Sequence, residues 1–460
     1  MPHWDSAGDD PRVRYAVGVL LGESDAQTFT LPRWMAYAMP EDCPRETRLL
    51  VVPSGFFGPR YGSIDTLPRL PLPAVQGTPL LYGTPRVERR ESTLVVHADV
   101  IASAYFLLTR YEEWVRGDVR DHHGRFRGAE SLPGRAGFLD RAVVEEYSEL
   151  LRRWAGEAGI EISNPRRRFS VILTHDVDTL GISRTPLQLA RSVGSAVLGR
   201  QPWKRARATI AVVAGLMPDP IGNAGYIDAM ERRLLGCAGK DRCQSVHFFL
   251  AGGRSIYDGA YSIGSRRARR AIGSLLAAGR TIGLHASYEA GGRPELVGSE
   301  RAKLEQVAAV QIHRNRHHYL RWREPSDGRE IAAAGISWDS TLGYADVAGF
   351  RLGVCHPVPL FDPSRQELLN IEEHPLIAMD VTLSSHEYMN LDVEKAFQYV
   401  CRLADTVRRH EGELVLLWHN YVFSAAYDSY HCSLYPRVLD YVAELMDQST
   451  RRASASATGC

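Results

Sequence analysis

The sequence has almost no excess of either charge, because its 55 lysines and arginines are balanced by 54 aspartates and glutamates. A formal net charge of +1 provides no overall field that would recruit nucleic acid or an anionic membrane. We therefore expect no nucleic-acid partner.

Long apolar runs are also lacking. No window reaches the roughly 20 apolar residues that a membrane span requires. The first residues, MPHWDSAGDDPRVRYAVGVLLGESD, carry charges where a signal peptide would be apolar. These features predict no membrane insertion and a cytoplasmic location.

Cysteine is scarce and scattered, with seven residues and no C-x-x-C pair. An odd number without paired spacing argues against a disulfide framework and against a thiolate zinc site. Cys355 is accordingly expected to be a small buried apolar side chain.

What the chain does have is length and a globular composition. Its 460 residues, 44% hydrophobic and 24% charged, are too many for one ordinary core and indicate at least two domains. Residues 1–165 predict a smaller α+β domain, with strands in RYAVGVLLG, RLLVVPSG and STLVVHADVIASAYFLLT and a helix in RAVVEEYSELLRRWAGEAG. Residues 449–460 are small and polar and predict a flexible tail.

The segment 166–448 alternates strand and helix patterns. We expect strands in FSVILTH, SVHFFLA, TIGLHAS, HYLRW, GISWDST, LIAMDV and ELVLLWH. Alternation of this kind predicts an α/β fold with a parallel sheet, and seven strands suit an irregular (β/α)7-type barrel.

Chemically capable side chains gather at the ends of these strands. Asp176 and Asp178 end the first strand on one face, and two carboxylates so close need a cation or a shared proton. Each signal alone has an ordinary reading, since D-x-D often caps a turn and a single histidine often packs in a core. Their placement together favours a metal held by carboxylate and imidazole, with His285, His317, His318 and His419 as the histidines at hand.

These motifs resemble the polysaccharide deacetylases of carbohydrate esterase family 4, the chitooligosaccharide deacetylase-like proteins, and in particular a branch with an extra N-terminal domain of unknown function. The matching pieces run in order from about residue 170 to 425 and are LTHDVD, IGLHASYE, HYLRWREP, AAAGISWDSTLGYADVAGFRLGVCHP, EEHPLIAMD and LVLLWHN.

The resemblance implies a role for each matched position. Asp176 corresponds to the general base, and Asp178 and His285 to metal ligands. Arg321 corresponds to the arginine that orients the base, with Arg323 as a competitor. The family's late leucine and histidine, which line the acetyl pocket and protonate the leaving amine, correspond to Leu416 and His419. Trp418 and Tyr288, in the same matching pieces, are further expected to bind substrate.

One position departs from the family pattern. Where the family carries a second histidine four residues after the first, this chain has Glu289. The third ligand is therefore left open between His318, which we favour, His317 and Glu289. Zinc is the expected metal for a mixed set of carboxylate and imidazole ligands.

Together these observations predict a metal-dependent hydrolase that removes N-acetyl groups, in preference to O-acetyl groups, from a carbohydrate or glycoconjugate in glycan biosynthesis. Two alternatives are a catalytically inactive carbohydrate-binding relative, favoured by Glu289, and a metal-dependent phosphoesterase built on the same D-x-D. The oligomeric state does not follow from the sequence.

Overall fold

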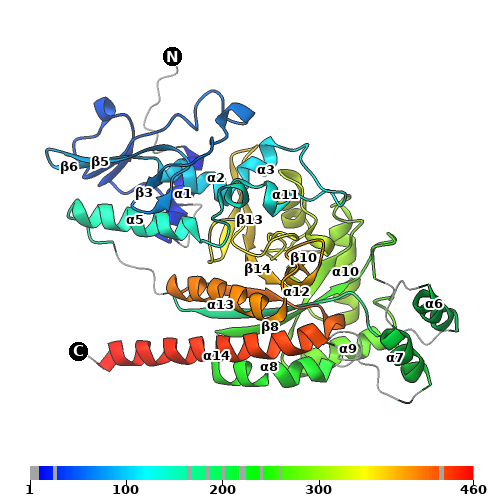
Figure 1. Cartoon of the computed structure of the whole chain (residues 1–460). Helices are drawn as coiled ribbons and strands as arrows, with labels where there is room; N and C mark the ends of the chain where they lie inside the picture. Colours follow the sequence, from blue (N-terminus) through cyan, green and yellow to red (C-terminus); the bar gives the residue numbers. More distant parts are fainter. Residues whose placement is uncertain are drawn as a thin grey trace. The chain divides into compact units, whose positions relative to one another are not determined.

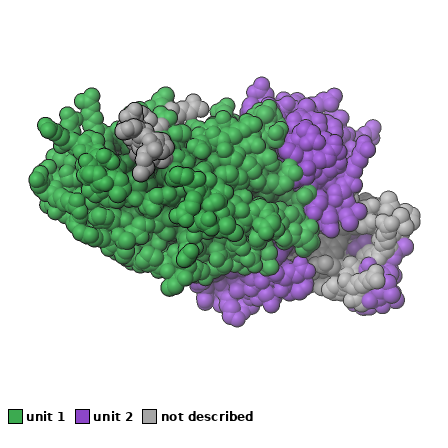
Figure 2. Space-filling model, turned by 90° about the horizontal axis from the view of Figure 1, so that it is seen from above, with its two compact units in different colours: residues 1–167, 320–377 green, residues 168–319, 378–460 purple. Residues whose placement is uncertain are grey.

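A computed structural model describes residues 10–23, 28–162, 167–181, 186–198, 203–214, 216, 224–238, 242–259, 261–423 and 429–458 (Figure 1). The chain divides into two compact units, coloured separately in Figure 2. The first unit combines Met1–Arg167 with Leu320–Ile377, and the second combines Arg168–Tyr319 with Ala378–Cys460. The boundaries expected at 165/166 and 448/449 stay a prediction.

The first unit is a mixture of short strands and helices. Its strands β1-β2-β6-β5 form one sheet, in which β1, β2 and β6 are parallel and β5 is antiparallel, and β3 pairs with β4. The segment 320–377 adds β12 and β11 on either side of β13. The elements are α1 (Pro11–Leu21), β1 (Met35–Tyr37), η2 (Pro40–Asp42), β2 (Leu49–Val51), η3 (Ile64–Thr66), β3 (Ala74–Val75), β4 (Thr78–Pro79), β5 (Gly83–Arg90), β6 (Thr93–Ala98), α2 (Val100–Leu108), α3 (Tyr111–Val115), η4 (Gly128–Glu130), α4 (Leu132–Ala136), α5 (Val143–Glu157), α11 (Ser326–Ala333), β11 (Trp338–Asp339), β12 (Val358–Asp362) and β13 (Glu367–Glu373).

One strand expected near the N-terminus is wrong and a second is confirmed only in its first half, because helix caps in these segments outweigh the apolar pattern. The run RYAVGVLLG lies in α1, where Asp10 accepts a hydrogen bond from the backbone of Arg12 and Gly22 ends the helix at φ 78°. In the later run, β6 stops at Ala98 and Asp99 begins α2 by capping the backbone of Ala102. The helix expected before the linker is confirmed as α5.

Contacts distant in sequence join 320–377 to the N-terminal residues of the first unit. The rings of Tyr15 and Phe361 stack with centroids 4.8 Å apart. The buried guanidinium of Arg351 pairs with Glu113, with Nη2 2.6 Å from Oε2. Breaking such a buried pair by removing one partner costs about 3–5 kcal/mol, so this contact fixes the segment firmly within the unit.

The second unit contains a parallel sheet in the order β10-β9-β8-β7-β15. The mixed α/β class is confirmed, whereas closure into a seven-stranded barrel stays a prediction. The elements are β7 (Ser170–Val177), α6 (Pro186–Val197), α7 (Trp203–Val213), α8 (Ala224–Ala238), β8 (Cys243–Leu250), α9 (Arg266–Ala277), β9 (Thr281–Ala286), α10 (Leu296–Ala308), β10 (Arg314–His317), η5 (His318–Leu320), α12 (Asp380–Ser384), α13 (Val393–Arg409), β15 (Glu413–Leu417), η6 (Asn420–Val422) and α14 (Ser429–Thr458). Strand β14 (Leu376–Met379) lies where the chain enters this unit again.

The strand expected in HYLRW is displaced. Strand β10 ends at His317, and His318 begins a turn in which Tyr319 has a φ of 63°. The positive φ of Tyr319 is incompatible with a continuing strand, so the apolar residues that follow do not extend the sheet.

Amphipathic helices account for the rest of the second unit. In α9 only Ala268, Ile272 and Leu275 are buried, at the spacing of one helix face. Figure 1 shows α8 and α13 beside the long helix α14, and contacts join α14 to both. Helix α14 reaches Thr458, so much of the segment expected as a tail is helical, in keeping with the high helix propensity of its alanines. Within the described residues, no helix has the length and apolar composition of a membrane span.

Candidate metal centre

The hydrogen-bonded register of the second unit brings the candidate residues to one face of the sheet. Asp176 on β7 lies opposite Phe248 on β8, and Leu250 lies opposite His285 on β9. His285 in turn lies opposite Arg316 on β10. Paired residues in a parallel sheet point the same way and alternate along each strand. Asp176, His285 and Arg316 therefore project from the same face.

Asp178, His285 and His318 form a compact group of possible metal ligands. One ligand atom from each lies within 4.8 Å of the other two. The Nε2 atoms of His285 and His318 lie 3.4 and 3.6 Å from the same Oδ1 of Asp178. Both histidines are buried and Asp178 is partly exposed, so the group is reachable from its Asp178 side.

The other candidates for the third ligand have different partners. Glu289 accepts hydrogen bonds from the backbone of Arg254 and from the guanidinium of Arg293, both at 3.1 Å. His317 alternates to the opposite face from Arg316, and its Nδ1 lies 3.1 Å from the amide of Asn315. Of the three residues left open, the geometry brings His318 into the group.

The orientation of each ligand histidine is fixed through its second nitrogen. Nδ1 of His285 lies 2.8 Å from the carbonyl oxygen of Arg316, which can only accept a hydrogen bond. Nδ1 of His318 lies 3.4 Å from Oδ1 of Asp258. A protonated Nδ1 leaves the lone pair on Nε2, which is the arrangement found in ligand histidines.

The buried atoms at the centre of the group fit a cation. Oδ1 of Asp178 and Nε2 of His285 are buried and make no hydrogen bond within the described part of the chain. A buried polar atom without a partner costs about 1–3 kcal/mol. A divalent ion bound between these two atoms would satisfy both.

The electrostatics favour positive charge at the same place. Burial opposes ionisation of Asp178, but His285, His419 and His318 hold the pKa of its carboxyl well below its usual range. Burial likewise opposes protonation of His285, yet Asp176 and Asp178 raise its pKa. The carboxylates thus draw a positive charge into the position where a metal ion would lie.

His419 faces the group from the end of β15. Its Nε2 lies 3.8 Å from Oδ2 of Asp178, and its Nδ1 lies 2.8 Å from Oδ1 of the fully buried Asp380. Burial alone would lower the pKa of His419, but Asp380, and after it Asp178 and Asp176, raise this pKa to about 10. A histidine that holds its proton at neutral pH is equipped to donate it.

The arginine beside Asp176 is Arg316, which corrects our assignment of Arg321. Nη1 of Arg316 donates to Oγ1 of Thr174 at 2.6 Å and to Oδ1 of Asp176 at 3.3 Å. Arg321 belongs to the first unit, where its Nε donates to the carbonyl of His123. The strand displacement explains the error, because β10 ends before the residues in which we expected it.

The structure places Leu416, expected to line the acetyl pocket, and Trp418, expected to bind substrate, away from the face of the site. On β15, Leu417 lies opposite Thr174 and shares the face of Asp176, whereas Leu416 lies opposite Leu173 on the other face. Trp418 is fully buried and packs against Tyr435 of α14, with ring centroids 4.9 Å apart. Leu417 therefore replaces Leu416 and Trp418 as the apolar residue on the side of the site.

Tyr288, the third residue expected to bind substrate, belongs to a cluster of three tyrosines. Its ring centroid lies 4.6 Å from that of Tyr257 and 5.2 Å from that of Tyr319. Tyr319 follows His318 in sequence, and their ring centroids lie 4.8 Å apart. The tyrosine cluster is joined to the ligand group through Asp258, which accepts a hydrogen bond from the backbone of Tyr288.

A family model matches part of the first unit. Residues 47–158, in the first unit, match DUF7033, a family of unknown function. No curated protein matches the chain.

Solved structures similar to this chain include two polysaccharide deacetylases. One comes from Mycobacterium smegmatis and is assigned as a polysaccharide deacetylase. It shares 18% identity over 62% of this chain and 86% of its own, with a TM-score of 0.37. The other, from Bacillus cereus, shares 10% identity over 60% and 88%, with a TM-score of 0.28. A GH57 branching enzyme from Thermococcus kodakaraensis shares 11% identity over 60% and 68%, with a TM-score of 0.28.

Proposed function

We propose that the second unit is a metal-dependent hydrolase that removes N-acetyl groups, in preference to O-acetyl groups, from a carbohydrate or glycoconjugate. The observation that carries this proposal is the arrangement around Asp178. His285 and His318 complete a ligand set, while Asp176 and His419 offer a base and an acid beside it.

The residues that would hold the metal are Asp178, His285 and His318, and their oxygen and nitrogen donors suit zinc before other transition ions. A divalent ion bound there would polarise the acetyl carbonyl and make a water molecule more acidic. Three protein ligands would leave a coordination position open for water or for the acetyl oxygen.

Asp176 is the proposed general base. Oδ2 of Asp176 lies 3.5 Å from Nε2 of His285, and Oδ1 faces the Arg316 guanidinium. Arg316 holds this carboxylate in place, and a carboxylate there can take a proton from water. Thr174 holds Arg316 in place and itself donates to the carbonyl of Leu416 at 2.7 Å.

His419 is the proposed general acid. Its Nδ1 is held by Asp380, so Nε2 carries the proton toward the side of Asp178. Donation of that proton to the departing amine nitrogen completes cleavage of the amide and leaves acetate. Asp380 also accepts a hydrogen bond from the backbone of His419 at 2.7 Å, which fixes the residue as well as its ring.

The tyrosine cluster supports a sugar as the substrate. Tyr257 is 39% exposed, and Tyr288 and Tyr319 are partly exposed beside it. Aromatic rings with one open face pack against the apolar face of a sugar ring, while their hydroxyls accept and donate hydrogen bonds.

The test is acetate release from a panel of N-acetylated and O-acetylated sugars, with Asp176→Asn and His419→Ala beside the unchanged chain. We expect each substitution to reduce hydrolysis by about 10²–10⁴-fold, the usual contribution of a general acid or base, while bound metal is retained. Hydrolysis unaffected by both substitutions, at full metal content, would refute these roles.

The two alternative functions have their own outcomes in the same experiment. A non-catalytic carbohydrate-binding protein would bind sugar and release no acetate. Glu289, in place of the family's second histidine, favours this alternative. Because His318 can serve as the third ligand beside Asp178 and His285, Glu289 supports it less strongly. A phosphoesterase would release phosphate from generic esters and leave the acetylated panel intact.

A further inference from the structure

The first unit contains a second group of possible metal ligands: Glu145, Cys355 and His356. Glu145 lies in the first turn of α5, and the other two precede β12. The backbone N–H of Val144 donates to the carbonyl of Gly353 at 2.8 Å, which ties the start of α5 to this loop. Gly353 has a φ of 70°, and a Cβ there would lie 2.9 Å from a methyl group of Val144, so the close approach requires glycine.

All three side chains are buried, and their ligand atoms lie within 4.8 Å of one another. The two oxygens of Glu145 divide between the other residues. Oε1 lies 3.3 Å from the backbone nitrogen and 3.9 Å from Sγ of Cys355. Oε2 lies 3.8 Å from Nε2 of His356.

These distances suit a shared cation better than direct pairing. A thiol is a weak donor, and 3.8 Å between an imidazole nitrogen and a carboxylate oxygen is too long for a hydrogen bond. Metal–ligand bonds of about 2.0–2.3 Å in a tetrahedron separate neighbouring ligand atoms by roughly 3.5 Å. Small movements of side chains would bring the three atoms onto one ion.

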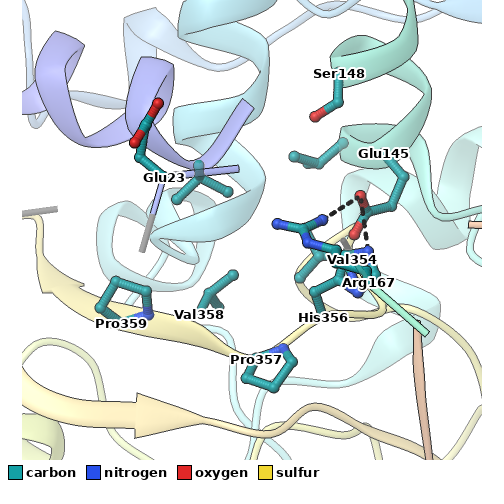
Figure 3. A pocket seen from close by; sticks show the side chains of 11 residues that line it. Glu23, Glu145, Ser148, Arg167, Val354, His356, Pro357, Val358 and Pro359 are labelled. Carbon is teal, nitrogen blue, oxygen red and sulfur yellow. Dashed lines mark ion pairs between the residues drawn. The ribbon is translucent and has the colours of Figure 1, made fainter. Parts of the chain in front are cut away.

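A small cavity adjoins Glu145 and His356 of this group. Its volume is about 30 Å³, enough for a water molecule, and Glu145, Ser148, Arg167 and His356 are among its lining residues. Figure 3 shows the side chains of Arg167 and His356 directed at the Glu145 carboxylate, with Glu23 on another side of the pocket. Nη1 of Arg167 lies 3.8 Å from the same Oε2 as His356.

We propose that Glu145, Cys355 and His356 bind a divalent cation of the zinc class, with the cavity as its exchangeable fourth position. A set of one sulfur, one nitrogen and one oxygen selects a soft or borderline ion over magnesium or calcium. Binding releases the Cys355 thiol proton to solvent, so the thiolate, the carboxylate and the imidazole together carry two negative charges against the two positive charges of the ion. Cys355, expected to be only a packing residue, would thus be a ligand.

The site of Glu145, Cys355 and His356 can be observed separately from the site in the second unit because only the former contains a sulfur ligand. Cobalt(II) bound by a thiolate gives a charge-transfer absorption in the near ultraviolet, which carboxylate and imidazole ligands do not produce. The experiment is a cobalt titration of the full chain carrying Asp178→Asn and His285→Ala, so that the site in the second unit is disabled. Cys355→Ser is then added, with Cys243→Ser, a buried cysteine of β8 outside both groups, as the matched control.

We expect one cobalt ion per chain with a thiolate band in the disabled background and with Cys243→Ser. Cys355→Ser should abolish the band and weaken cobalt binding by more than about 10-fold, the lower end of the loss seen when a group that merely supports a ligand is removed. A band that survives Cys355→Ser, or no band at millimolar cobalt, would overturn the proposal.

A second pair of variants covers the case in which Cys355→Ser does not fold. His356→Gln should also weaken cobalt binding by more than about 10-fold. Arg167→Gln removes a positive charge that competes for Glu145 and should tighten binding a few-fold. If both variants bind cobalt with the affinity of the disabled background, the cluster is only a structural ion-pair network.

Discussion

At the residue scale, the far nitrogen of each site histidine determines what the near nitrogen can do. In His285, His318 and His419, Nδ1 faces an oxygen, supplied by the Arg316 carbonyl, Asp258 and Asp380 in turn. In all three, Nε2 faces Asp178. His285 and His318 offer Nε2 to a metal, whereas His419 is proposed to give up a proton from Nε2. Against the effect of burial, Asp380, and after it Asp178 and Asp176, raise the pKa of His419 to about 10.

Arg316 and Arg321 give a direct test of which arginine supports Asp176. Arg316→Lys keeps the charge but loses the guanidinium, whose Nη1 donates to both Thr174 and Asp176. A hydrogen bond to a charged group contributes about 1.5–3 kcal/mol, so we expect kcat/KM for acetate release to fall roughly 10–100-fold. Arg321→Lys is the matched control, and a larger loss there than with Arg316→Lys would reverse the assignment.

Asp380 is expected to act through His419. Asp380→Asn removes the carboxylate that holds Nδ1 and favours the protonated ring. We predict a loss of about 10²–10⁴-fold in kcat, with KM and metal content little changed. Steady-state kinetics measures kcat and KM for Asp380→Asn. The matched control is Asp392→Asn, which changes the N-cap of α13. A rise in KM with kcat unchanged would assign Asp380 to substrate binding instead.

Local sequence identified part of this site. Asp176, Asp178, His285 and His419 were found because each follows an apolar strand pattern and together they form one chemical set. Asp258 and Asp380 were missed because a lone aspartate in a loop or at a helix start has no pattern that distinguishes it from a cap. Their partners, His318 and His419, lie far away in sequence.

At the element scale, close packing between strands positions the arginine. Gly283 on β9 leaves room for the ring of Phe248, over which the Arg316 guanidinium lies 4.8 Å from the centroid. A Cβ at position 283 would lie 2.5 Å from that ring. The absence of a side chain at one position thus determines where a charged group stands on the next strand.

Gly283→Ala is predicted to destabilise the protein by about 1–3 kcal/mol through overpacking, and to reduce acetate release by moving Phe248 and Arg316. Gly273→Ala is the control, because this exposed position in α9 has nothing within 4 Å of the added methyl group. That change should stabilise by up to about 1 kcal/mol, as alanine does in a helix. Urea unfolding measures both, and equal effects would contradict the packing account.

A buried polar junction joins β7, α8 and α14. Oε1 of Glu231 lies 2.6 Å from Nε2 of His175 and accepts a hydrogen bond from the Tyr435 hydroxyl, also at 2.6 Å. Burial opposes ionisation of Glu231, but His175 and then Tyr435 lower its pKa to about 2. His175 therefore has a structural partner on the face away from the metal ligands.

The junction predicts a pH dependence of stability. Because the folded-state pKa of Glu231 lies below its usual 4.5, its contribution is complete above pH 4.5 and is lost as the pH falls toward 2. The shift corresponds to about 3 kcal/mol. Glu231→Gln should therefore lower the free energy of unfolding at pH 7 and change it little near pH 2. Glu444→Gln, exposed on α14, should show no such trend, and a pH-independent difference for Glu231→Gln would contradict the assignment.

At the scale of the whole molecule, the alternation of strand and helix predicted the mixed α/β class, but not which segments form each unit. The placement of 320–377 with the N-terminal residues depends on pairs such as Arg351 with Glu113 and Tyr15 with Phe361. Such pairs are separated by hundreds of positions, and neither member carries a local signal. Helix and strand in the N-terminal segments were confused for a related reason, because short apolar runs suit both.

We propose that the second unit hydrolyses acetylated sugar with a metal held by Asp178, His285 and His318. The most direct measurement is acetate release by the chain as purified, after removal of metal with a chelator, and after zinc is returned. We predict that removal of the metal lowers the rate of acetate release by about 100-fold or more. Zinc should restore the rate in the unchanged chain but not in Asp178→Asn. Acetate release at an unchanged rate from metal-free protein would contradict it.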